Sequence, residues 1–453
     1  MIVDSILSTV GGTPLIPLKR IGKHLKCNLY AKCEFFNPGG SVKDRIAVRM
    51  IEKAEESGRI KPGDTLIEPT SGNTGLGLAL AGAVKGYNVI VTMPEKMSKE
   101  KQVVLEALGA KIIRTPTEAA WDAPESHIGV AKKLEAELPN AHILDQYSNM
   151  DNPMAHYEGT GAEILEDLNG QVDMVVMGAG TGGTITGVAK KIKEQKPDCI
   201  IVGADPEGSI LAGGDEVGTY KVEGIGYDFI PEVLDRTVID RWVKTNDRQS
   251  FLLARQLIRE EGMLCGGSSG AALYAALVEA SKLEEGANCV VVLPDGVRNY
   301  LTKFIDDKWM VDNRFITSCS LEGTIGDFAR DKGNAELVCL SSKDNLHTAI
   351  SLMRDKGFSQ IPVTDEGTLK GMLYERDLLE FLLSIGDAGS DVQVSEVMNR
   401  NVPTVRYETP LSVLQELLLI SGSVVLVDSA KCPKFIVTKI DLVEWIANGK
   451  QKN

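Results

Sequence analysis

Short β-type runs alternate with helical stretches from Leu66 to about Pro294, and this alternation limits the fold more than any other feature of the chain. Five runs are rich in Val, Ile and Met: Asn88 to Met93, Lys111 to Arg114, Met174 to Met177, Cys199 to Ala204 and Cys289 to Leu293. Between the first two, Ser98 to Leu108 has helical spacing and ends at Gly109, a typical helix stop. This recurrence predicts an α/β fold with parallel sheets flanked by helices.

The pattern changes after Phe315, where the chain contains an internal repeat. The segment Asp377 to Leu382 resembles Asp441 to Ile446, and each follows an apolar run. Their spacing of about 64 residues is longer than a solenoid repeat, and two copies indicate a paired module. The pattern resembles the CBS module, a βαββα unit that pairs pseudo-symmetrically and often binds adenosyl ligands. We therefore predict two domains, 1–315 and 316–453. The second domain contains two copies of the module, about 320–385 and about 390–448.

The charge of the chain narrows the choice of partners. It carries 49 basic and 63 acidic residues, a formal charge of −14, which opposes non-specific binding to nucleic acid or to an anionic membrane surface. No apolar run has the length of a membrane span, and Met1 to Gly12 lacks a secretory signal, so we expect a cytoplasmic protein. Small molecules or proteins are the expected partners. The Cys and His residues show no metal-binding spacing, so we expect reduced thiols and no metal site.

The sequence Gly178-Ala-Gly180-Thr-Gly-Gly183 lies between an apolar run and a helical stretch. It fits the dinucleotide pattern, and Asp205 follows about twenty residues later, where a ribose-binding acid would stand. Glycines before a helix also let backbone N–H groups approach any phosphate, and the hydroxyls of Thr181 and Thr184 suit a terminal phosphate monoester. This motif alone favours NAD and a phosphorylated cofactor equally.

The stretch Asn37-Pro-Gly-Gly-Ser-Val-Lys43-Asp-Arg45 places a lysine directly after a glycine-rich turn, at the start of a helical run. An arbitrary lysine is usually a solvated surface residue. Here the backbone around the amine is fixed, and burial beside a cofactor would lower its pKa as imine chemistry requires. Lys43 is therefore the candidate catalytic residue.

Two further loops lead into helices and carry hydroxyl and amide groups. In the first, four such residues surround one helix start: Thr70, Ser71, Asn73 and Thr74. A single hydroxyl would be enough for capping, so the surplus indicates a carboxylate site. The second loop, Leu264 to Gly270, is weak on its own.

In this order, over residues 5 to about 310, the motifs closely resemble the fold-type II pyridoxal-phosphate enzymes, and among them the cystathionine β-synthase family. The CBS pair at the C-terminus, a regulatory domain in that family, completes the match. The resemblance implies pyridoxal 5′-phosphate as cofactor, with Lys43 bound to its aldehyde, Asn73 at the phenolic oxygen and Ser268 at the pyridine nitrogen. It assigns the phosphate to Gly180, Thr181, Gly182, Gly183 and Thr184. It assigns the substrates to Thr70, Ser71, Thr74, Gln146, Tyr147 and Tyr227.

The implied reaction is a β-replacement in which L-serine and L-homocysteine give L-cystathionine and water, a step of transsulfuration and cysteine biosynthesis. Cysteine in place of serine would release hydrogen sulfide. Cysteine synthase, which uses O-acetylserine and sulfide, shares the lysine, the asparagine loop and the glycine loop, so these motifs do not separate the two reactions. The segment Gly-Ile-Gly-Tyr227-Asp and the C-terminal modules favour the first.

The family also suggests what else accompanies the reaction. Its animal members carry an N-terminal haem segment with Cys and His ligands, and this sequence starts too late to contain one, so no haem is expected. Those members have a CxxC near Cys199, where this chain has a single cysteine, so no redox pair is expected. Family members form dimers and higher assemblies, which predicts a homo-oligomer.

The repeat contains three candidate regulatory residues: Asp377, Thr438 and Asp441. They stand where CBS modules commonly contact ribose, which makes S-adenosylmethionine a candidate effector. The acids are equally well placed as helix caps, and both interpretations remain open. Two other classes of function fit parts of the sequence. One is an adenosyl-ligand sensor with a silent catalytic half, which the intact Lys43 argues against. The other is an oxidoreductase built on Gly178 to Asp205, which would bind NADH and lack a visible chromophore.

Overall fold

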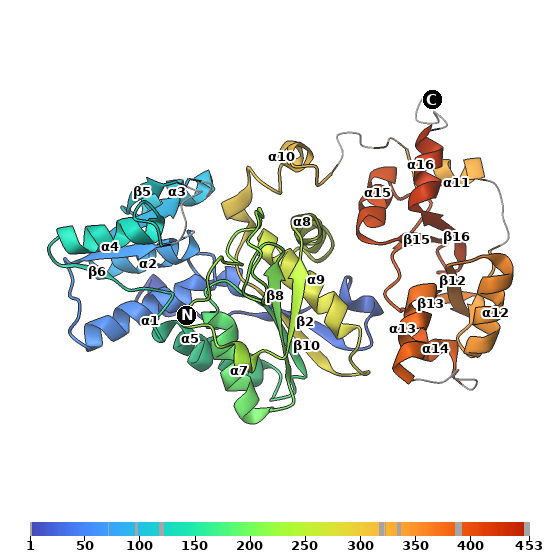
Figure 1. Cartoon of the computed structure of the whole chain (residues 1–453), viewed down its shortest axis with the longest axis horizontal. Helices are drawn as coiled ribbons and strands as arrows, with labels where there is room; N and C mark the ends of the chain where they lie inside the picture. The colour runs from blue at the N-terminus through green and yellow to red at the C-terminus, as the bar shows by residue number, and fades with distance from the viewer. Residues whose placement is uncertain are drawn as a thin grey trace. The chain divides into compact units, whose positions relative to one another are not determined.

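The computed structural model describes residues 2–70, 72–95, 98–116, 122–316, 321, 323–332, 337–385 and 392–447. The chain forms two compact units: Met1–Gly22 with Lys26–Phe315, and Lys23–Leu25 with Ile316–Asn453 (Figure 1). The first unit contains two separate sheets, where the sequence indicated only that parallel sheets were present. The second unit contains the two copies of the repeat.

The larger sheet of the first unit has six strands. In spatial order they are β1 (Leu15–Pro17), β2 (Asn28–Cys33), β10 (Asn288–Leu293), β7 (Met174–Gly178), β8 (Ile200–Pro206) and β9 (Arg241–Thr245). All neighbours are parallel except β1 and β2. The central strands are covered on both faces, which explains their nearly continuous apolar sequence.

The smaller sheet has four parallel strands. In spatial order they are β5 (Lys111–Thr115), β4 (Asn88–Pro94), β3 (Thr65–Pro69) and β6 (Ala141–Ile143). The predicted strands therefore divide between two sheets. The predicted crossover helix between β4 and β5 is present as well, one residue shorter at each end than Ser98 to Leu108.

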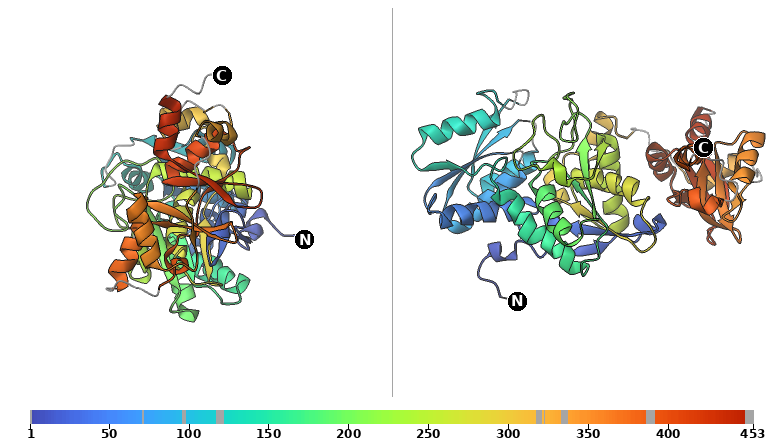
Figure 2. Two further views of the ribbon diagram at one scale, coloured as in Figure 1. Left: turned by 90° about the vertical axis from the view of Figure 1, so that its right-hand side faces the viewer. Right: turned by 60° about the horizontal axis from the view of Figure 1, so that its bottom comes forward.

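Helices flank both sheets, as expected for an α/β fold. Those of the first unit are α1 (Lys43–Glu56), α2 (Asn73–Lys85), α3 (Lys99–Ala107), α4 (His127–Glu137), α5 (Asp151–Ala155), α6 (Gly161–Asp167), α7 (Gly183–Gln195), α8 (Asp247–Gln256), α9 (Gly267–Ala280) and α10 (Asp307–Asp312). On the larger sheet, α7 packs against Val175 and Met177, whose side chains lie on the same face of β7. Helix α9 also contacts this sheet. On the smaller sheet, α4 packs on Ile67 and Ile90, whereas α2 and α3 pack on Val91. Figure 2 shows the ribbons of helices beside the strands of the first unit.

The second unit contains two three-stranded sheets with the same topology. The elements of the first copy are β11 (Leu340–Ser341), α12 (Leu346–Lys356), β12 (Gln360–Asp365), β13 (Thr368–Tyr374) and α13 (Glu375–Ile385). Those of the second are β14 (Thr404–Val405), α15 (Leu411–Ile420), β15 (Ser423–Val427), β16 (Pro433–Thr438) and α16 (Lys439–Ala447). In each copy the first two strands are parallel and the last two antiparallel. This is the βαββα pattern of the CBS module.

The helix that precedes each copy packs on the other copy. Helix α11 (Ile325–Lys332) places Ile325 and Phe328 in the apolar core of the second copy. Helix α14 (Val394–Val397) places Val394 in the core of the first. Proximity in the sequence assigns each leading helix to the copy that follows it. Packing instead places the apolar side chains of that helix in the core of the other copy.

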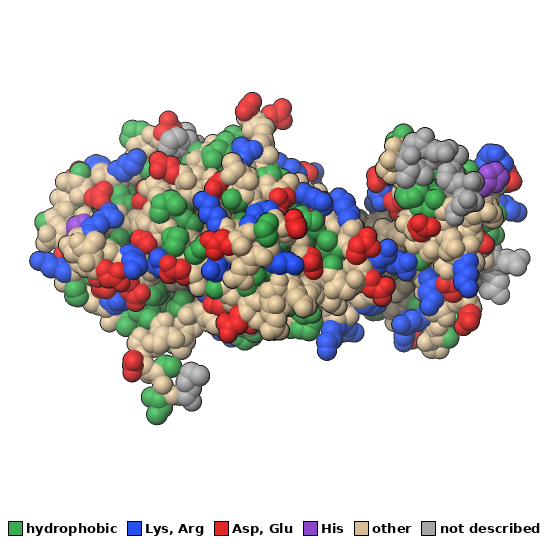
Figure 3. All heavy atoms as spheres, turned by 90° about the horizontal axis from the view of Figure 1, so that it is seen from below, with side chains coloured by type: hydrophobic (Ala, Val, Ile, Leu, Met, Phe, Trp, Pro, Cys, Tyr) green, Lys and Arg blue, Asp and Glu red, His purple; other side chains and the backbone are tan. Residues whose placement is uncertain are grey.

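Surface charges of both signs are mixed. On the face that Figure 3 shows, acidic and basic side chains are interspersed. No helix within the described residues has both the length and the apolar character that crossing a membrane requires.

Candidate active site

A cavity lined largely by polar side chains lies in the first unit. Seven residues that the sequence singles out line it: Lys43, Asn73, Thr74, Gln146, Thr181, Tyr227 and Ser268. They come from segments far apart in the chain, so the fold brings the predicted motifs together around one space.

Lys43 is the first residue of α1 and lines the cavity. The loop before it is anchored, because Ser41 forms an isolated antiparallel bridge with Asp295 and Val42 N donates to Pro294 O at 2.8 Å. Burial lowers the pKa of Lys43 to about 8, although the negative charge of Asp295 opposes this shift. A substantial fraction of this amine is therefore neutral near physiological pH, as nucleophilic chemistry requires.

The glycine loop connects β7 to the start of α7. Gly182 has φ +88°, a Cβ on Gly180 would lie 2.5 Å from the carbonyl oxygen of Gly224, and a Cβ on Gly183 would lie 1.9 Å from Asn152 Oδ1. These three positions therefore require glycine. The loop leads into the N-terminus of a 13-residue helix, where free backbone N–H groups and the helix dipole favour an anion such as phosphate.

Asp205, the residue that supported a dinucleotide site, is buried and engaged within the protein. Its Oδ2 accepts hydrogen bonds from Lys244 Nζ at 2.7 Å and from the backbone N of Ala212 at 3.0 Å. A ribose-binding acid needs a carboxylate that is available to two sugar hydroxyls. The contacts of Asp205 therefore count against the dinucleotide interpretation.

The asparagine loop lies between β3 and α2, and its predicted residues make different contacts. Thr74 Oγ1 donates to Gln146 Oε1 at 2.6 Å, and Gln146 Nε2 donates to the carbonyl oxygen of Pro69 at 3.1 Å. These bonds fix the orientation of the Gln146 amide. Thr70 is buried, and its Oγ1 accepts from Gly72 N at 3.1 Å. Ser71 lies outside the residues that the structure describes.

Two residues that sequence reasoning missed hold the Asn73 amide. Asn73 Nδ2 donates to Asp295 Oδ2 at 2.8 Å, and Asn299 Nδ2 donates to Asn73 Oδ1 at 3.3 Å. Asp295 lines the cavity, burial raises its pKa, and its Oδ1 has no partner. The signal that was available is the position of Asp295 just after β10, at the carboxyl edge of a parallel sheet, where α/β proteins place their ligands.

Ser268 and Tyr227 also line the cavity, and Tyr147 contacts Tyr227. Ser268 is buried in the first turn of α9. The hydroxyls of Tyr147 and Tyr227 lie 3.3 Å apart, and their rings meet edge to face at 5.5 Å. Burial, followed by the neighbouring Tyr227, raises the pKa of Tyr147 well above its usual value. Tyr147 therefore stays a neutral donor over the physiological pH range.

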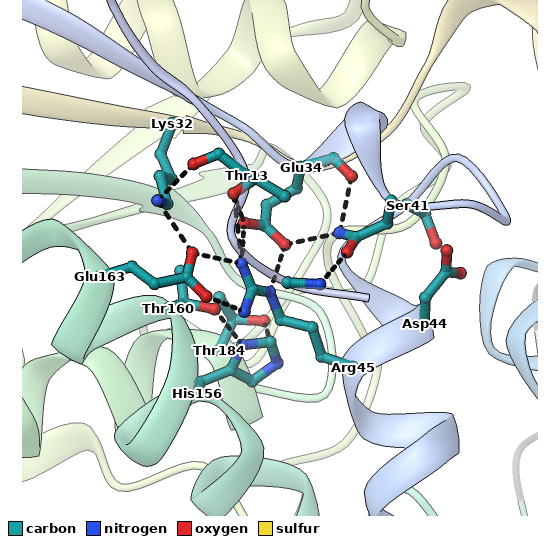
Figure 4. A network of polar contacts seen from close by, with 12 residues as sticks. Thr13, Lys32, Glu34, Ser41, Asp44, Arg45, His156, Thr160, Glu163 and Thr184 are labelled. Atoms are coloured by element: carbon teal, nitrogen blue, oxygen red, sulfur yellow. Dashed lines mark hydrogen bonds and ion pairs between the residues drawn. The ribbon is translucent and has the colours of Figure 1, made fainter. Parts of the chain in front are cut away.

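A buried ionic network surrounds Arg45, two residues after Lys43 (Figure 4). Arg45 donates to Glu34 from Nε at 2.7 Å and to both carboxylate oxygens of Glu163, at 2.6 and 2.7 Å. Lys32 Nζ lies 2.9 Å from Glu163 Oε2. Burial alone would raise the pKa of Glu163, but Arg45 and Lys32 bring it down to about 2. The network therefore joins α1 and α6 through charges that stay ionised.

The candidate regulatory residues lie in the second unit. Thr438 donates to Asp441 Oδ2 from its backbone N at 2.7 Å and from Oγ1 at 2.6 Å, at the start of α16. This is the geometry of a helix cap. Asp377 lies in the first turn of α13 and accepts from Arg376 at 3.3 Å. Tyr374 precedes α13 where Thr438 precedes α16, so the two copies differ at this position.

No group of three or more His, Cys, Asp or Glu side chains that could hold a metal ion occurs in the parts of the chain that the structure describes. The seven cysteines described are free thiols.

The chain is similar to proteins of known family over nearly its whole length. Residues 6–295 match the family model described as pyridoxal-phosphate dependent enzyme, and residues 326–384 and 394–448 match the CBS domain. A cystathionine beta-synthase of Dictyostelium discoideum is 51% identical over 470 residues, which cover 100% of this chain and 94% of that protein. A cystathionine beta-synthase of Rattus norvegicus is 53% identical over 429 residues, which cover 92% of this chain and 76% of that protein.

A solved structure extends the similarity to the fold. The O-acetylserine dependent cystathionine beta-synthase of Helicobacter pylori is 39% identical, with a TM-score of 0.63, and the match covers 67% of this chain and 98% of that one.

Proposed function

The chain belongs to the pyridoxal-phosphate dependent enzymes and, within them, to the cystathionine beta-synthase family, and from this premise we propose which of its residues carry out the condensation of L-serine with L-homocysteine. One observation supports the proposal most strongly. A buried lysine with a lowered pKa lines the same cavity as Asn73 of the asparagine loop and Thr181 of the glycine loop. Domain 1–315 is the catalytic domain in this proposal, and 316–453 is regulatory.

The residues present fit pyridoxal phosphate. Gly180, Gly182 and Gly183 leave no room for side chains and offer an anion site at the start of α7, where Thr181 and Thr184 add hydroxyls. Asn73 is oriented by Asp295 and Asn299 and lines the cavity, and in the proposal its amide contacts the phenolic oxygen. When bound, the cofactor supplies an electron sink that acidifies the Cα proton of an amino acid attached to its aldehyde.

Lys43 is the residue that moves protons in this scheme. Its Nζ would hold the aldehyde of the cofactor in the resting enzyme, and the amine would be free to act as a base while the amino acid substrate is bound. The free amine takes the Cα proton of serine and later returns a proton to Cα. Burial favours its neutral form, which is the form able to accept that proton.

Ser268 faces the pyridine nitrogen in the proposal. A hydroxyl is neutral and stays close to its ordinary acidity, so it does not hold a proton on that nitrogen as a carboxylate would. A ring without that proton would supply a weaker electron sink, which suits elimination of the β-substituent rather than transamination. The burial of Ser268 supports this role, because water is excluded from the bond.

The carboxylate of the amino acid substrate binds at the start of α2, where Thr70, Ser71, Thr74 and Gln146 are assigned to it. The N-terminus of α2 provides free N–H groups, and the fixed amide of Gln146 directs its remaining donor. Tyr147 and Tyr227 are assigned to the side where the thiol of the second substrate enters. Their paired hydroxyls provide polar contacts on that side.

We expect the Thr74→Val substitution to raise the KM for serine by about tenfold and to change kcat much less. The substitution removes the donor to Gln146 Oε1, so the amide that helps to bind the carboxylate is no longer fixed. Steady-state kinetics at fixed homocysteine measure the effect. Thr65→Val, at the opposite end of β3, is the matched control and should behave as the parent. Equal losses of kcat and kcat/KM in Thr74→Val would contradict the assignment.

The pH dependence of cofactor binding reports on Lys43. Half of the amine is neutral at its pKa of about 8, so the neutral fraction rises through pH 8 and approaches its limit roughly one pH unit higher. We therefore expect the rate at which the cofactor-free protein takes up pyridoxal phosphate to rise with pH and to level off above about pH 9. Absorbance after rapid mixing measures the rate, with free Nα-acetyl-lysine as the control amine. A rise that continues to pH 10 would indicate a solvated lysine.

The substrates are tested by mass spectrometry of the products from serine plus homocysteine and, separately, from O-acetylserine plus sulfide. Efficient formation of cystathionine from serine is the expected result. The second candidate, O-acetylserine sulfhydrylation, is kept because a structural neighbour is named for its dependence on O-acetylserine. Efficient cysteine formation without cystathionine would favour that candidate and overturn the assignment of Tyr227. Release of hydrogen sulfide from cysteine plus homocysteine is measured with the same protein.

We also propose S-adenosylmethionine as the effector of the second domain. The T-x-x-D arrangement of Thr438 and Asp441 orders the start of α16, where the resemblance to CBS modules puts the ribose contact. Calorimetry on active protein tests this role, and the absence of heat would leave the residues as caps alone. A homo-oligomer in the cytoplasm completes the proposal, supported by the free thiols of the described cysteines.

A further inference from the structure

His156 is buried, and both of its ring nitrogens contact hydroxyl groups (Figure 4). Its Nδ1 lies 3.0 Å from Thr160 Oγ1, and its Nε2 lies 3.1 Å from Thr184 Oγ1. Thr184 is the second residue of α7 and belongs to the glycine loop assigned to the cofactor phosphate. The imidazole therefore lies directly behind the phosphate site, on the side away from the cavity lining.

The backbone around His156 is specialised for this position. Residues His156–Thr160 form a single π-helical turn between α5 and α6, and such turns occur frequently at functional sites. Helix α7 approaches this turn closely, because a Cβ on Gly187 would lie 2.0 Å from the carbonyl oxygen of Pro153 and 2.9 Å from His156 Cβ. The close approach lets the ring span the gap between Thr160 and Thr184.

The surroundings keep the imidazole neutral. Burial lowers the pKa of His156 well below its usual value, and the positive charges of Arg45 and Lys43 act in the same direction, while Glu163 opposes them. A neutral imidazole has one N–H donor and one acceptor nitrogen. One hydroxyl partner must therefore accept a hydrogen bond from the ring, and the other must donate one to it.

We propose that His156 is a positioning residue that directs the hydroxyl proton of Thr184 at the cofactor phosphate. In this arrangement Nε2–H donates to Thr184 Oγ1, and Nδ1 accepts the hydroxyl proton of Thr160. The single proton of Thr184 is then left for a phosphate oxygen. The inference rests on the proposed function, because it assumes that a phosphate occupies the glycine loop.

The opposite tautomer would have the opposite effect. If Nδ1 carried the proton, Nε2 would accept the proton of Thr184, and Thr184 would present only lone pairs to the anion. A phosphate therefore selects the Nε2–H tautomer. The imidazole, which never touches the phosphate, decides whether Thr184 attracts or repels it.

The test compares two ligands that differ only in the phosphate group. Cofactor-free protein is titrated with pyridoxal phosphate and with pyridoxal, in buffer without phosphate, and binding is followed by absorbance. We expect His156→Leu to weaken pyridoxal phosphate by about 10- to 100-fold, the range for a lost hydrogen bond to a charged group, and to leave pyridoxal within about threefold. The ³¹P resonance of the bound cofactor should shift in the same variant.

Three further variants keep the result interpretable. His156→Gln can place an amide N–H near the position of Nε2–H, so it should retain most of the affinity. Thr160→Val removes the donor to Nδ1 in a smaller change that preserves side-chain volume, and it should weaken pyridoxal phosphate selectively by about 3- to 10-fold. His142→Leu, at a half-buried histidine on β6, is the matched control and should bind both ligands as the parent does.

The outcomes distinguish a failure of this inference from a failure of the proposed function. Equal weakening of both ligands in His156→Leu, or an unselective effect of Thr160→Val, would mean that His156 only packs, and this inference would be overturned. If His156→Leu does not fold, Thr160→Val and His156→Gln decide by the same ratio. If the parent protein binds neither ligand, the proposed function itself fails.

Discussion

A Lys43→Ala protein will lack the visible absorbance of the cofactor-bound enzyme and lose cystathionine synthesis by at least about 10²- to 10⁴-fold, the usual contribution of proton transfer alone. Alanine removes both the amine that binds the cofactor aldehyde and the group that moves the Cα proton. Among the residues that the structure describes, Lys43 is the only lysine that lines the cavity, together with Asn73 and Ser268. The absorbance spectrum and the product yield are measured on the same preparation.

The control for this experiment lies on the same helix. Lys53 is near the end of α1, exposed and paired with Glu56 at 2.6 Å. Lys53→Ala therefore changes the helix by the same substitution but leaves the cavity untouched, and it should keep the spectrum and the activity. Substantial turnover by Lys43→Ala, with Lys53→Ala unchanged, would remove Lys43 from the mechanism.

Replacing Arg45 with methionine will destabilise the first unit by about 3–5 kcal/mol, since it leaves buried carboxylates without their counter-charge. Arg45 is the shared partner of Glu34 and Glu163, and Lys32 can compensate only the second of these at its distance of 2.9 Å. We expect the thermal midpoint to fall by roughly 6–15 °C. Calorimetry or circular dichroism on the cofactor-free protein measures the change, so that cofactor binding does not mask it.

Arg49→Met is the comparison for this prediction. Arg49 lies one turn further along α1 and pairs with Asp151 and Glu158 where solvent reaches the charges. Exposed ion pairs contribute about 0–1 kcal/mol, so Arg49→Met should lower the midpoint by no more than a few degrees. Similar losses for both variants would show that the burial of the Arg45 network does not matter. Adding Glu34→Gln to Arg45→Met should recover part of the stability, because it removes one uncompensated charge.

The parts of the site that depend on neighbouring residues were predictable. Lys43 follows a glycine turn, and the glycine loop stands between a strand and a helix, so each is recognisable from a few consecutive residues. Local chemistry alone, however, left the glycine loop open to NAD. The fold decides against that interpretation through the ion pair of Asp205 with Lys244, which connects neighbouring strands of the larger sheet.

The parts that depend on distant residues were not predictable in the same way. Asp295 and Asn299 orient Asn73 from more than two hundred residues away, and the position of Asp295 just after an apolar run is the only signal of this role in the sequence. Glu163 resembles a solvated helix residue, yet the fold buries most of it against Arg45. The role proposed for His156 depends on its contact with Thr184, which lies on another helix.

The arrangement of the strands illustrates the same limit. Alternating strands and helices predict parallel sheets, but not how many sheets share the strands. Strand β2 pairs with β10, so that Asn28 lies beside Asn288. This pairing adds to the larger sheet a strand that precedes the alternating region of the sequence. Only tertiary packing decides such a pairing.

The crossed packing of α11 and α14 makes the duplicated region inseparable. A protein cut between the two copies would give two fragments, each with an orphan helix and a core that lacks one wall. Phe328 would lose its contacts with the second copy, and Val394 would lose those with the first. We therefore expect the two copies to unfold together, and a molecule that binds the folded form of one copy should raise the unfolding temperature of both.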